Sequence, residues 1–357
     1  MPTKEQLLAR PITHFDLKSS DPTAVVEGMR QMAYSARDLA RAADIYKRML
    51  DDRDCGIMLC LAGSLVSAGL KQIFVDMIRN RMVDAIVSTG ANIVDQDFFE
   101  GLGFKHYIAE ERLKAGLDDD MLRELHIDRI YDTLIDEDEL RICDDTTRLI
   151  ADALPGRPYS SREFIREMGS YLAEQHKARM VQQGEDSIVL AAFEEDVPIF
   201  CPAFSDCSAG FGLVAHQHAR GEGAKVSIDS VKDFYELTQL KIANPTTGLF
   251  MLGGGVPKNF AQDVVVAADV LGVEAPMHKY AVQVTVADVR DGALSSSTLK
   301  EASSWGKVDT AYEQMVFSEA TLAVPLIAGF GYHSGAWKNR IARRWTRVLE
   351  AAVPAGV

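Results

Sequence analysis

Short apolar runs that recur between helical patterns constrain the fold of this chain more than any other feature. The runs have the length of strands and are almost uninterrupted. They are Gly56–Leu61, Ala85–Ser88, Ser187–Ala192, Ile199–Cys201, Leu249–Leu252 and Tyr280–Val286. Strands covered on both faces are apolar throughout, whereas half-exposed strands alternate apolar and polar residues. The pattern therefore predicts strands that are buried between layers of other elements.

Segments with apolar residues at helical spacing fill the intervals between these runs. They are Pro22–Met49, Leu70–Arg79, Ser160–Gln183, Ser230–Ala243 and Asn259–Leu271. The third begins with Ser-Ser-x-Glu, which is typical of a helix N-terminus. Alternating strands and helices indicate an α/β protein with a doubly wound, mainly parallel sheet and helices on both faces. We predict a Rossmann-like fold, although the motif G-x-G-x-x-G is absent.

The chain has no internal linker, so we predict one domain over residues 22–345, preceded by an arm (1–21) and followed by a tail (346–357). Near the end, the basic run Lys338–Arg347 has Ile341 and Trp345 at helical spacing, which predicts a surface helix.

Charge and cysteine content limit the possible partners. The net charge of −14 repels phosphate backbones, so we do not expect nucleic acid to bind. No run approaches the ~18 apolar residues that span a membrane, and the N-terminus lacks a signal-peptide pattern, so we predict a cytoplasmic protein. The five cysteines contain no C-x-x-C pair, which favours buried free thiols over disulfides or a metal site.

Small and polar residues follow five of the predicted strands. The segments are Ala62-Gly63-Ser64, Thr89-Gly90-Ala91, Pro202–Asp206, Gly253–Gly255 and Ala287-Asp288. Any one of them alone is explained as a turn. Because ligands of open α/β sheets bind beyond the carboxyl ends of the strands, the set predicts a ligand cleft. Backbone amides at a helix start after Gly255 favour an anion such as a cofactor pyrophosphate.

A lysine near the C-terminus has neighbours suited to covalent chemistry. The segment is Glu301-Ala302-Ser303-Ser304-Trp305-Gly306-Lys307. A lysine whose pKa is lowered by desolvation or by charge forms imines with carbonyl or iminium carbons. Trp305 offers an apolar wall that attracts cations, and Glu301 can hold an ammonium or transfer protons. The alternative interpretation is an exposed lysine beside a core tryptophan.

This segment resembles the active-site lysine motif of the deoxyhypusine synthase family. Other segments match the family in the same order: Ser64–Gly69, Ser88–Ala91, Pro202–Asp206, Gly253–Lys258 and Ser318–Pro325. The resemblance extends from about Pro22 to Phe330. It implies NAD as cofactor and a reaction without net redox change. In that family, NAD oxidises spermidine and the aminobutyl group passes as an imine to the lysine. The group then passes to an acceptor amine, and NADH reduces the product.

The resemblance also implies roles for individual residues. Lys307 resembles the imine-forming lysine. Substrate contacts are implied for Glu301, Trp305, Asp95, Asn259, Asp263 and Gly292. Cofactor contacts are implied for Gly63, Ser64, Ser67, Thr89, Gly90, Ala91, Asp206, Gly254, Val286, Ala287, Glu319 and Ala320.

Three positions depart from the family pattern. Asn259 stands where the family has a histidine that accepts a proton, and asparagine cannot act as a general base. Phe211 and Leu294 stand where the family has aspartates that bind ammonium groups. Loss of two carboxylates weakens charge pairing with a polyamine. We therefore expect the family chemistry with an altered amine-recognition end.

Three functions follow as hypotheses. The first is aminoalkyl transfer to a small polyamine such as putrescine, as in the related homospermidine synthases. The second is deoxyhypusine formation on a translation-factor lysine, and the third is an NAD-binding regulatory protein without turnover. The resemblance implies a homotetramer with active sites at a dimer interface.

Overall fold

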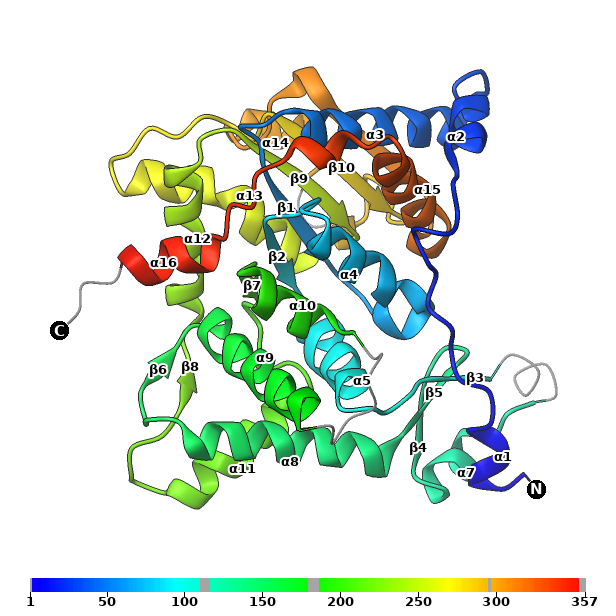
Figure 1. Cartoon of the computed structure of the whole chain (residues 1–357), viewed down its shortest axis with the longest axis vertical. Helices are drawn as coiled ribbons and strands as arrows, with labels where there is room; N and C mark the ends of the chain where they lie inside the picture. Colours follow the sequence, from blue (N-terminus) through cyan, green and yellow to red (C-terminus); the bar gives the residue numbers. More distant parts are fainter. Residues whose placement is uncertain (1, 110–115, 179–185, 295–296, 353–357) are drawn as a thin grey trace.

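A parallel sheet of six strands forms the centre of the molecule (Figure 1). The computed structural model describes residues 2–109, 116–178, 186–294 and 297–352. The strands are β1 (Gly56–Leu61), β2 (Ala85–Ser88), β7 (Ile199–Phe200), β9 (Thr247–Leu252), β10 (Tyr280–Thr285) and β11 (Glu313–Phe317). Their order, β11-β10-β9-β1-β2-β7, is that of doubly wound dinucleotide-binding folds. The predicted fold class is confirmed.

Helices cover both faces of this sheet, which explains why the strands are apolar throughout (Figure 1). In β1, Leu59 packs into one apolar core and Cys60 into the other. The helices α3 (Tyr34–Asp51), α4 (Lys71–Arg79) and α15 (Ala320–His333) contribute to the first core. The second core includes residues of α12 (Ser230–Ala243), α13 (Gly255–Val270), α14 (Leu299–Ser304) and α16 (Trp345–Ala352).

The remaining elements surround this framework. The antiparallel strands β3 (Tyr107–Ile108), β5 (Thr133–Asp136) and β4 (Ile127–Ile130) form a second sheet, and β6 (Pro158–Tyr159) pairs with β8 (Ser227–Ile228). Within the described residues, the other α-helices are α1 (Lys4–Leu7), α2 (Thr23–Met29), α5 (Phe99–Gly101), α7 (Asp119–Glu124), α8 (Glu137–Ala153), α9 (Ser161–Lys177), α10 (Ile188–Glu195) and α11 (Ser208–Arg220). Two π-helical segments, η1 (Val66–Leu70) and η2 (Ala91–Phe98), follow β1 and β2. Three 3₁₀ turns are η3 (Gly292–Leu294), η4 (Thr310–Tyr312) and η5 (Ala336–Asn339).

The strand predicted at Ser187–Ala192 is wrong, because this segment begins the helix α10. Ser187 caps the helix by accepting a hydrogen bond from the Leu190 amide at 2.9 Å. The buried carboxylate of Asp97 accepts two more from the amides of Ile188 and Val189. A helix that is apolar on all sides has the same composition as a buried strand, so periodicity cannot separate them.

The predictions were incomplete at three further places. The helix predicted over Pro22–Met49 is interrupted between α2 and α3, and Tyr34 there has a φ of +56°. Strand β11 escaped prediction because, as an edge strand, it begins with the polar residues Glu313 and Gln314. The helix predicted from Ser160 is α9, which ends at Lys177, and residues 179–183 of that prediction lie outside the described part.

The surface helix predicted for the basic run Lys338–Arg347 is also wrong in part. Regular α-helix begins only at Trp345 and continues as α16 to Ala352, within the predicted tail; residues 353–357 of that prediction lie outside the described part. Trp345 is 3% exposed and packs on the backbone of β1, where a Cβ at Gly56 would lie 2.5 Å from its ring. Arg340 is buried as well.

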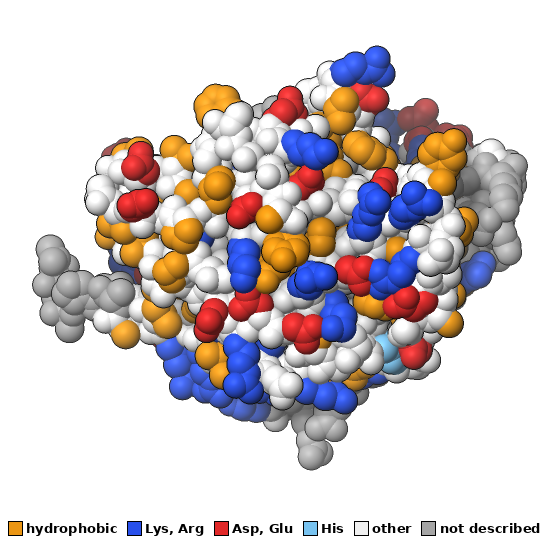
Figure 2. All heavy atoms as spheres, turned by 90° about the horizontal axis from the view of Figure 1, so that it is seen from above, with side chains coloured by type: hydrophobic (Ala, Val, Ile, Leu, Met, Phe, Trp, Pro, Cys, Tyr) orange, Lys and Arg blue, Asp and Glu red, His pale blue; other side chains and the backbone are white. Residues whose placement is uncertain are grey.

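The predicted free thiols are confirmed: all five cysteines are free and only Cys207 is partly exposed. Over the described ranges, we find no helix that combines the length and the apolar character needed to cross a membrane. On the face drawn in Figure 2, acidic and basic side chains are interspersed over most of the surface.

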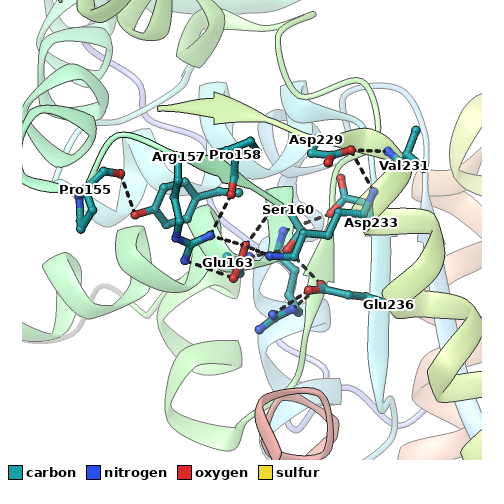
Figure 3. A network of polar contacts seen from close by, with 12 residues as sticks. Pro155, Arg157, Pro158, Ser160, Glu163, Asp229, Val231, Asp233 and Glu236 are labelled. Carbon is teal, nitrogen blue, oxygen red and sulfur yellow. Dashed lines mark hydrogen bonds and ion pairs between the residues drawn. The ribbon is translucent and has the colours of Figure 1, made fainter. Parts of the chain in front are cut away.

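Helix α12 is fastened to α9 by a buried polar network (Figure 3). Ser160 and Glu163 form the predicted capping box at the start of α9. The Arg162 guanidinium donates to Glu236 of α12 at 2.7 and 3.0 Å, and the Ser160 hydroxyl donates to the same carboxylate at 2.9 Å. Lys232 of α12 donates to Glu163 at 2.7 Å. These bonds hold α12 in place from one side, while its opposite side borders a groove described below.

Candidate active site

The loops that follow the parallel strands gather at one edge of the sheet. The chain reverses its direction of sheet growth between β1 and β9, which is the position where doubly wound folds bind ligands. The loops touch there, because a Cβ added at Gly253 would lie 3.0 Å from the Cβ of Ala62. Gly253 also has a φ of +79°, so a side chain would be strained as well as crowded.

Two buried amides fix the loops after β1 and β2. Asn92 accepts a hydrogen bond from the Leu65 amide at 2.7 Å and donates to the hydroxyl of Thr89 at 3.1 Å. Gln96 accepts from the Ser67 amide at 2.8 Å. Neither Asn92 nor Gln96 was predicted from the sequence. Their signal would have been two amide residues four positions apart, just after the end of a buried strand.

A cavity of about 610 Å³ lies beside these loops. It is lined by Ile12, Ser64, Ser67, Ala68, Ile108, Ile130, Tyr131, Asp132, Thr133, Glu319 and Thr321. Three of the predicted cofactor residues are therefore brought together: Ser64, Ser67 and Glu319. The tight turn between β4 and β5 also lines the cavity. This turn was not predicted from the sequence to contact a ligand.

The other predicted cofactor residues occupy the same edge without lining this cavity. Gly63 follows β1, Thr89, Gly90 and Ala91 follow β2, and Val286 and Ala287 follow β10. The others lie at helix starts: Asp206 precedes α11, Gly254 caps α13 and Ala320 begins α15. Gly90 allows the closest approach, since a Cβ there would lie 2.6 Å from the Cys207 sulfur. A Thr89-Gly90-Ala91 turn therefore packs directly against the loop after β7.

Asp95 lies in this region in an unusual environment. Its carboxylate accepts a hydrogen bond from the Ser208 amide at 2.7 Å. Burial raises the pKa of Asp95 to about 7, with Asp144 nearby as a further cause. Burial likewise raises the pKa of Asp144 to about 6. Titrating carboxylates of this kind are typical of functional sites, although structural networks produce them too.

We expect Asp95→Asn to remove part of the pH dependence of stability. Because folding raises the pKa of Asp95 from 3.8 to about 7, the folded state binds more protons between these values. Its contribution to the free energy of unfolding therefore falls as pH rises from about 4 to 7, by about 1.4 kcal/mol for each unit of pKa. Urea unfolding at pH 5 and pH 8 should show a smaller decrease in the variant. The exposed neighbour Asp145, changed to asparagine, is the control, and an equal decrease in wild type and Asp95→Asn would contradict the prediction.

The lysine motif forms a short helix with a defined start and end. Thr298 and Glu301 make a reciprocal capping box at the start of α14. At the other end, the Lys307 amide donates to the Ala302 carbonyl at 3.1 Å and the Gly306 amide to the Ser303 carbonyl at 3.0 Å. These two bonds are the Schellman pattern, and Gly306 supplies the required positive φ of +70°. The sequence Trp-Gly-Lys thus ends a helix and directs Lys307 away from it.

The backbone of Lys307 is anchored to the start of β10. The His278 amide donates to the Lys307 carbonyl at 2.9 Å, and the His278 carbonyl accepts from the Asp309 amide at 2.9 Å. Burial holds the pKa of His278 well below its usual range, so its ring is neutral between the Thr247 hydroxyl at 2.8 Å and the Ala261 carbonyl at 3.0 Å. Lys241 donates to the same hydroxyl at 2.8 Å. None of this anchoring was expected from the sequence.

The Lys307 side chain lies in an apolar groove of about 560 Å³ between α12 and α13. The groove is lined by Val231, Phe234, Tyr235, Thr238, Asp263, Val266, Ala267, Val270, Leu271, Trp305 and Lys307. The Lys307 side chain is 14% exposed, and its Nζ lies 2.5 Å from Oδ1 of Asp263. The same Nζ lies 5.2 Å from the centre of the Trp305 ring. The groove thus combines one nucleophile, one carboxylate and an aromatic wall.

The other predicted substrate residues are less closely grouped. Asn259 lies one turn before Asp263 on α13, so the two share a face of that helix. Glu301 is exposed and its carboxylate accepts from the Thr298 amide, while Gly292 is an exposed residue at the start of η3. At the two altered positions, Leu294 is buried in the second core and Phe211 is 68% exposed on α11.

The groove and the cavity at the strand ends are separate within one chain. Among the described residues they have no lining residue in common. Lys307 is fastened to the segment that enters β10, whereas the cofactor candidates follow the strands at their carboxyl ends. A reaction between the two would need a second copy of the chain or a rearrangement.

The fold and these features define a Rossmann-like α/β protein with a lysine in an apolar groove. A model of the deoxyhypusine synthase family matches residues 24–330. The chain is 60% identical over 349 residues to a deoxyhypusine synthase-like protein of Chlorobaculum parvum, covering 98% of this chain and 97% of that one. A protein of the same name from Elusimicrobium minutum is 60% identical over 340 residues, covering 95% and 88%. This chain belongs to the deoxyhypusine synthase family.

Among solved structures, a protein assigned as a deoxyhypusine synthase from Entamoeba histolytica has the same fold. The TM-score is 0.57 at 20% sequence identity, and the alignment covers 90% of this chain and 97% of that one. The recognition of the family from the lysine motif and the strand ends is confirmed. Membership of the family supports a transferase of the aminobutyl-transferring type.

Proposed function

We propose that this protein is an NAD-dependent aminoalkyl transferase that carries the group as an imine on Lys307 and passes it to a small polyamine such as putrescine. The observation that carries the proposal is the environment of the Lys307 amine, which lies in an apolar groove beside Asp263 and Trp305. A lysine removed from bulk water next to a proton-accepting group is the arrangement that imine chemistry requires.

The cavity at the strand ends supports NAD as the cofactor. Ser64 and Ser67 offer hydroxyls beside a loop at the switch point. Glu319, whose carboxylate caps α15, lines the same cavity, and acidic residues bind a ribose hydroxyl in dinucleotide sites. Deoxyhypusine synthases as a family use NAD. When bound, NAD supplies the hydride acceptor that makes an otherwise unreactive C–N bond exchangeable. The chain itself orients the amine and excludes water.

A small acceptor is supported by the restricted charge of the groove. Among the residues that line it, Asp263 is the acidic one. Leu294 and Phe211 cannot pair with ammonium groups, so the site has lost two of the contacts that would hold a long polycation. A diamine needs fewer such contacts. Deoxyhypusine formation on a protein lysine is the alternative.

We also propose a homotetramer in which each active site lies across a dimer interface. The separation of the groove from the strand-end cavity within one chain supports this arrangement. Large apolar side chains around the groove are exposed, with Val231 at 77%, Val270 at 81% and Trp305 at 67%. A second copy would cover them and would exclude water from Lys307.

Product mass separates the two acceptors. The protein is incubated with NAD and spermidine, together with either putrescine or the translation factor that carries hypusine. We expect homospermidine from putrescine and no mass increase of the factor. Modification of the factor alone would overturn the small-molecule proposal. The replacement of the proton-accepting histidine by Asn259 favours a second candidate, an NAD-binding protein without turnover, for which neither product would form while NAD still bound.

Tyr131 should contribute to NAD affinity through the turn between β4 and β5. This residue lines the strand-end cavity, is 78% exposed and has a φ of +50°, at a turn position where glycine is usual. Stacking of a base on an aromatic ring contributes about 1–3 kcal/mol. We therefore expect Tyr131→Gly to weaken binding of NAD and of ADP-ribose about tenfold in calorimetric titrations, whereas Tyr131→Phe does not.

The matched control is Tyr34→Gly, because Tyr34 is another exposed tyrosine with a positive φ, of +56°, and lies outside the cavity. Nicotinamide mononucleotide should bind equally to all variants. Unchanged NAD affinity in Tyr131→Gly would show that the turn does not contact the base.

A further inference from the structure

We propose that Asp263 is the proton acceptor for Lys307 and that it replaces the general base missing at position 259. The inference rests on the proposed function and assigns a catalytic residue to it. Asp263 and Asn259 lie one turn apart on the same face of α13. In this proposal, the general base lies one helical turn after the position at which the family has its histidine.

The contact between the two groups is direct. Oδ1 of Asp263 lies 2.5 Å from Nζ of Lys307, and this oxygen is buried. The Asp263 side chain as a whole is 37% exposed, so its other side remains open to the groove. A proton acceptor must lie within reach of the proton that it removes, and Asp263 meets this requirement in distance, while its buried Oδ1 has no other hydrogen-bond partner.

The other charged groups near Lys307 are engaged elsewhere. The buried amine of Lys258 donates to the carbonyls of Leu294 and Ser297, and burial lowers the pKa of Lys258 to about 8. Glu301 caps α14 with its carboxylate. Among the described residues, Asp263 is therefore the carboxylate in ion-pair contact with Lys307.

The apolar groove makes the proton transfer accessible. In water an aspartate would not remove a proton from a lysine, because both ionic forms are well solvated. The groove is lined by Val266, Phe234 and Trp305, and apolar walls of this kind keep water away from reacting groups. Covering the exposed side by substrate or by a second copy strengthens this effect.

The proposed step conserves atoms and charge. The Lys307 ammonium gives a proton to the Asp263 carboxylate, which leaves a neutral amine and a carboxylic acid. The amine attacks the carbon of the protonated imine of the oxidised donor, for which NAD would be the hydride acceptor, and a C–N bond forms. A second proton passes from the Lys307 nitrogen to the departing nitrogen, the bond between carbon and that nitrogen breaks, and Asp263 returns its proton, so that the amine leaves as an ammonium and Lys307 carries the protonated imine. Transfer to the acceptor amine follows the same steps in reverse.

The first test is Asp263→Asn, which keeps the shape and removes the base. We expect the rate of borohydride-trappable adduct formation on Lys307 to fall about 10²-fold or more, since general bases contribute about 10²–10⁴-fold. Raising the pH should recover much of this loss in the variant, because hydroxide can then deprotonate Lys307 without Asp263. The control is Asp269→Asn, which changes an exposed aspartate on the same helix.

The second test moves the base back by one turn. The double variant Asn259→His/Asp263→Asn should regain at least tenfold over Asp263→Asn, whereas Asn259→His alone should change the rate little. Melting temperatures of all variants separate a catalytic effect from a loss of folding. A purely structural role for Asp263 predicts a stability loss, no recovery at high pH and no rescue by histidine.

Failure of this inference differs from failure of the proposed function. If the wild-type protein forms no adduct with any amine in the presence of NAD, the proposed function is wrong. If the wild type forms the adduct and Asp263→Asn forms it at the same rate over the whole pH range, Asp263 is not the proton acceptor.

Discussion

Lys307→Ala is expected to abolish amine exchange while leaving NAD binding unchanged. Removing a covalent nucleophile lowers the rate by at least about 10³-fold, because the remaining groups cannot form the intermediate. The carbonyl of residue 307 still accepts from the His278 amide in the variant, so the local backbone should persist. Product formation from spermidine, putrescine and NAD is read by mass spectrometry, together with borohydride trapping of the adduct.

The matched control for this prediction is Lys300→Ala, because Lys300 is an exposed lysine on the same short helix. We expect wild-type exchange in the control. Exchange retained in Lys307→Ala would remove the imine mechanism. Loss of NAD affinity in the same variant would instead indicate that Lys307 contacts the cofactor, which the separation of groove and cavity argues against within one chain.

Arg340→Met is expected to cost about 3–5 kcal/mol in the free energy of unfolding, as loss of one partner of a buried ion pair usually does. Arg340 is 3% exposed and lies 2.5 Å from Asp84, which is 4% exposed. The guanidinium also donates to the carbonyls of Arg81, Met49 and Cys55, at 2.6, 3.1 and 3.2 Å. The variant leaves the Asp84 charge and three carbonyls without this partner. Urea unfolding measures the change.

Two further variants sharpen this prediction. Lys338→Met removes an exposed cation two residues away and should have little effect. The double variant Asp84→Asn/Arg340→Met should recover part of the loss, because it removes the buried charge left without its partner. Equal stability of wild type and Arg340→Met would show that the pair contributes nothing. The Nε of Arg343 lies 3.8 Å from Asp84. If Arg343 replaces Arg340 as the partner of Asp84, the double variant will recover none of the loss.

Much of the fold was predictable because its signals are local. Strands β1 and β2 and helix α12 begin and end where the apolar patterns placed them. The Ser160–Glu163 capping box was visible as a four-residue pattern. Where a pattern is compatible with two structures, prediction failed: Ser187–Ala192 begins a helix that Ser187 caps locally and that Asp97, about 90 positions earlier in the chain, supports with two more hydrogen bonds.

The candidate site was predictable in its parts and not in its arrangement. The lysine motif pointed to Lys307, and the resemblance to the family implied residues such as Ser67 and Glu319. Three features were not visible in the sequence: the contact of Lys307 with Asp263, its anchoring by His278, and the turn with Tyr131 beside the cavity. Each depends on segments far apart in the chain.

The amino-acid sequence by itself determined the periodicity of most strands and helices, the capping pattern of Ser160 and Glu163, and the motif by which the family was recognised. Only the tertiary structure decided which carboxylate meets that lysine, that Arg340 is buried against Asp84, and that the groove and the strand-end cavity are separate. The physical reason is the separation in sequence of the residues that interact. Backbone periodicity and capping depend on residues within a few positions, whereas desolvation and ion pairing depend on which distant segments the packed core brings together.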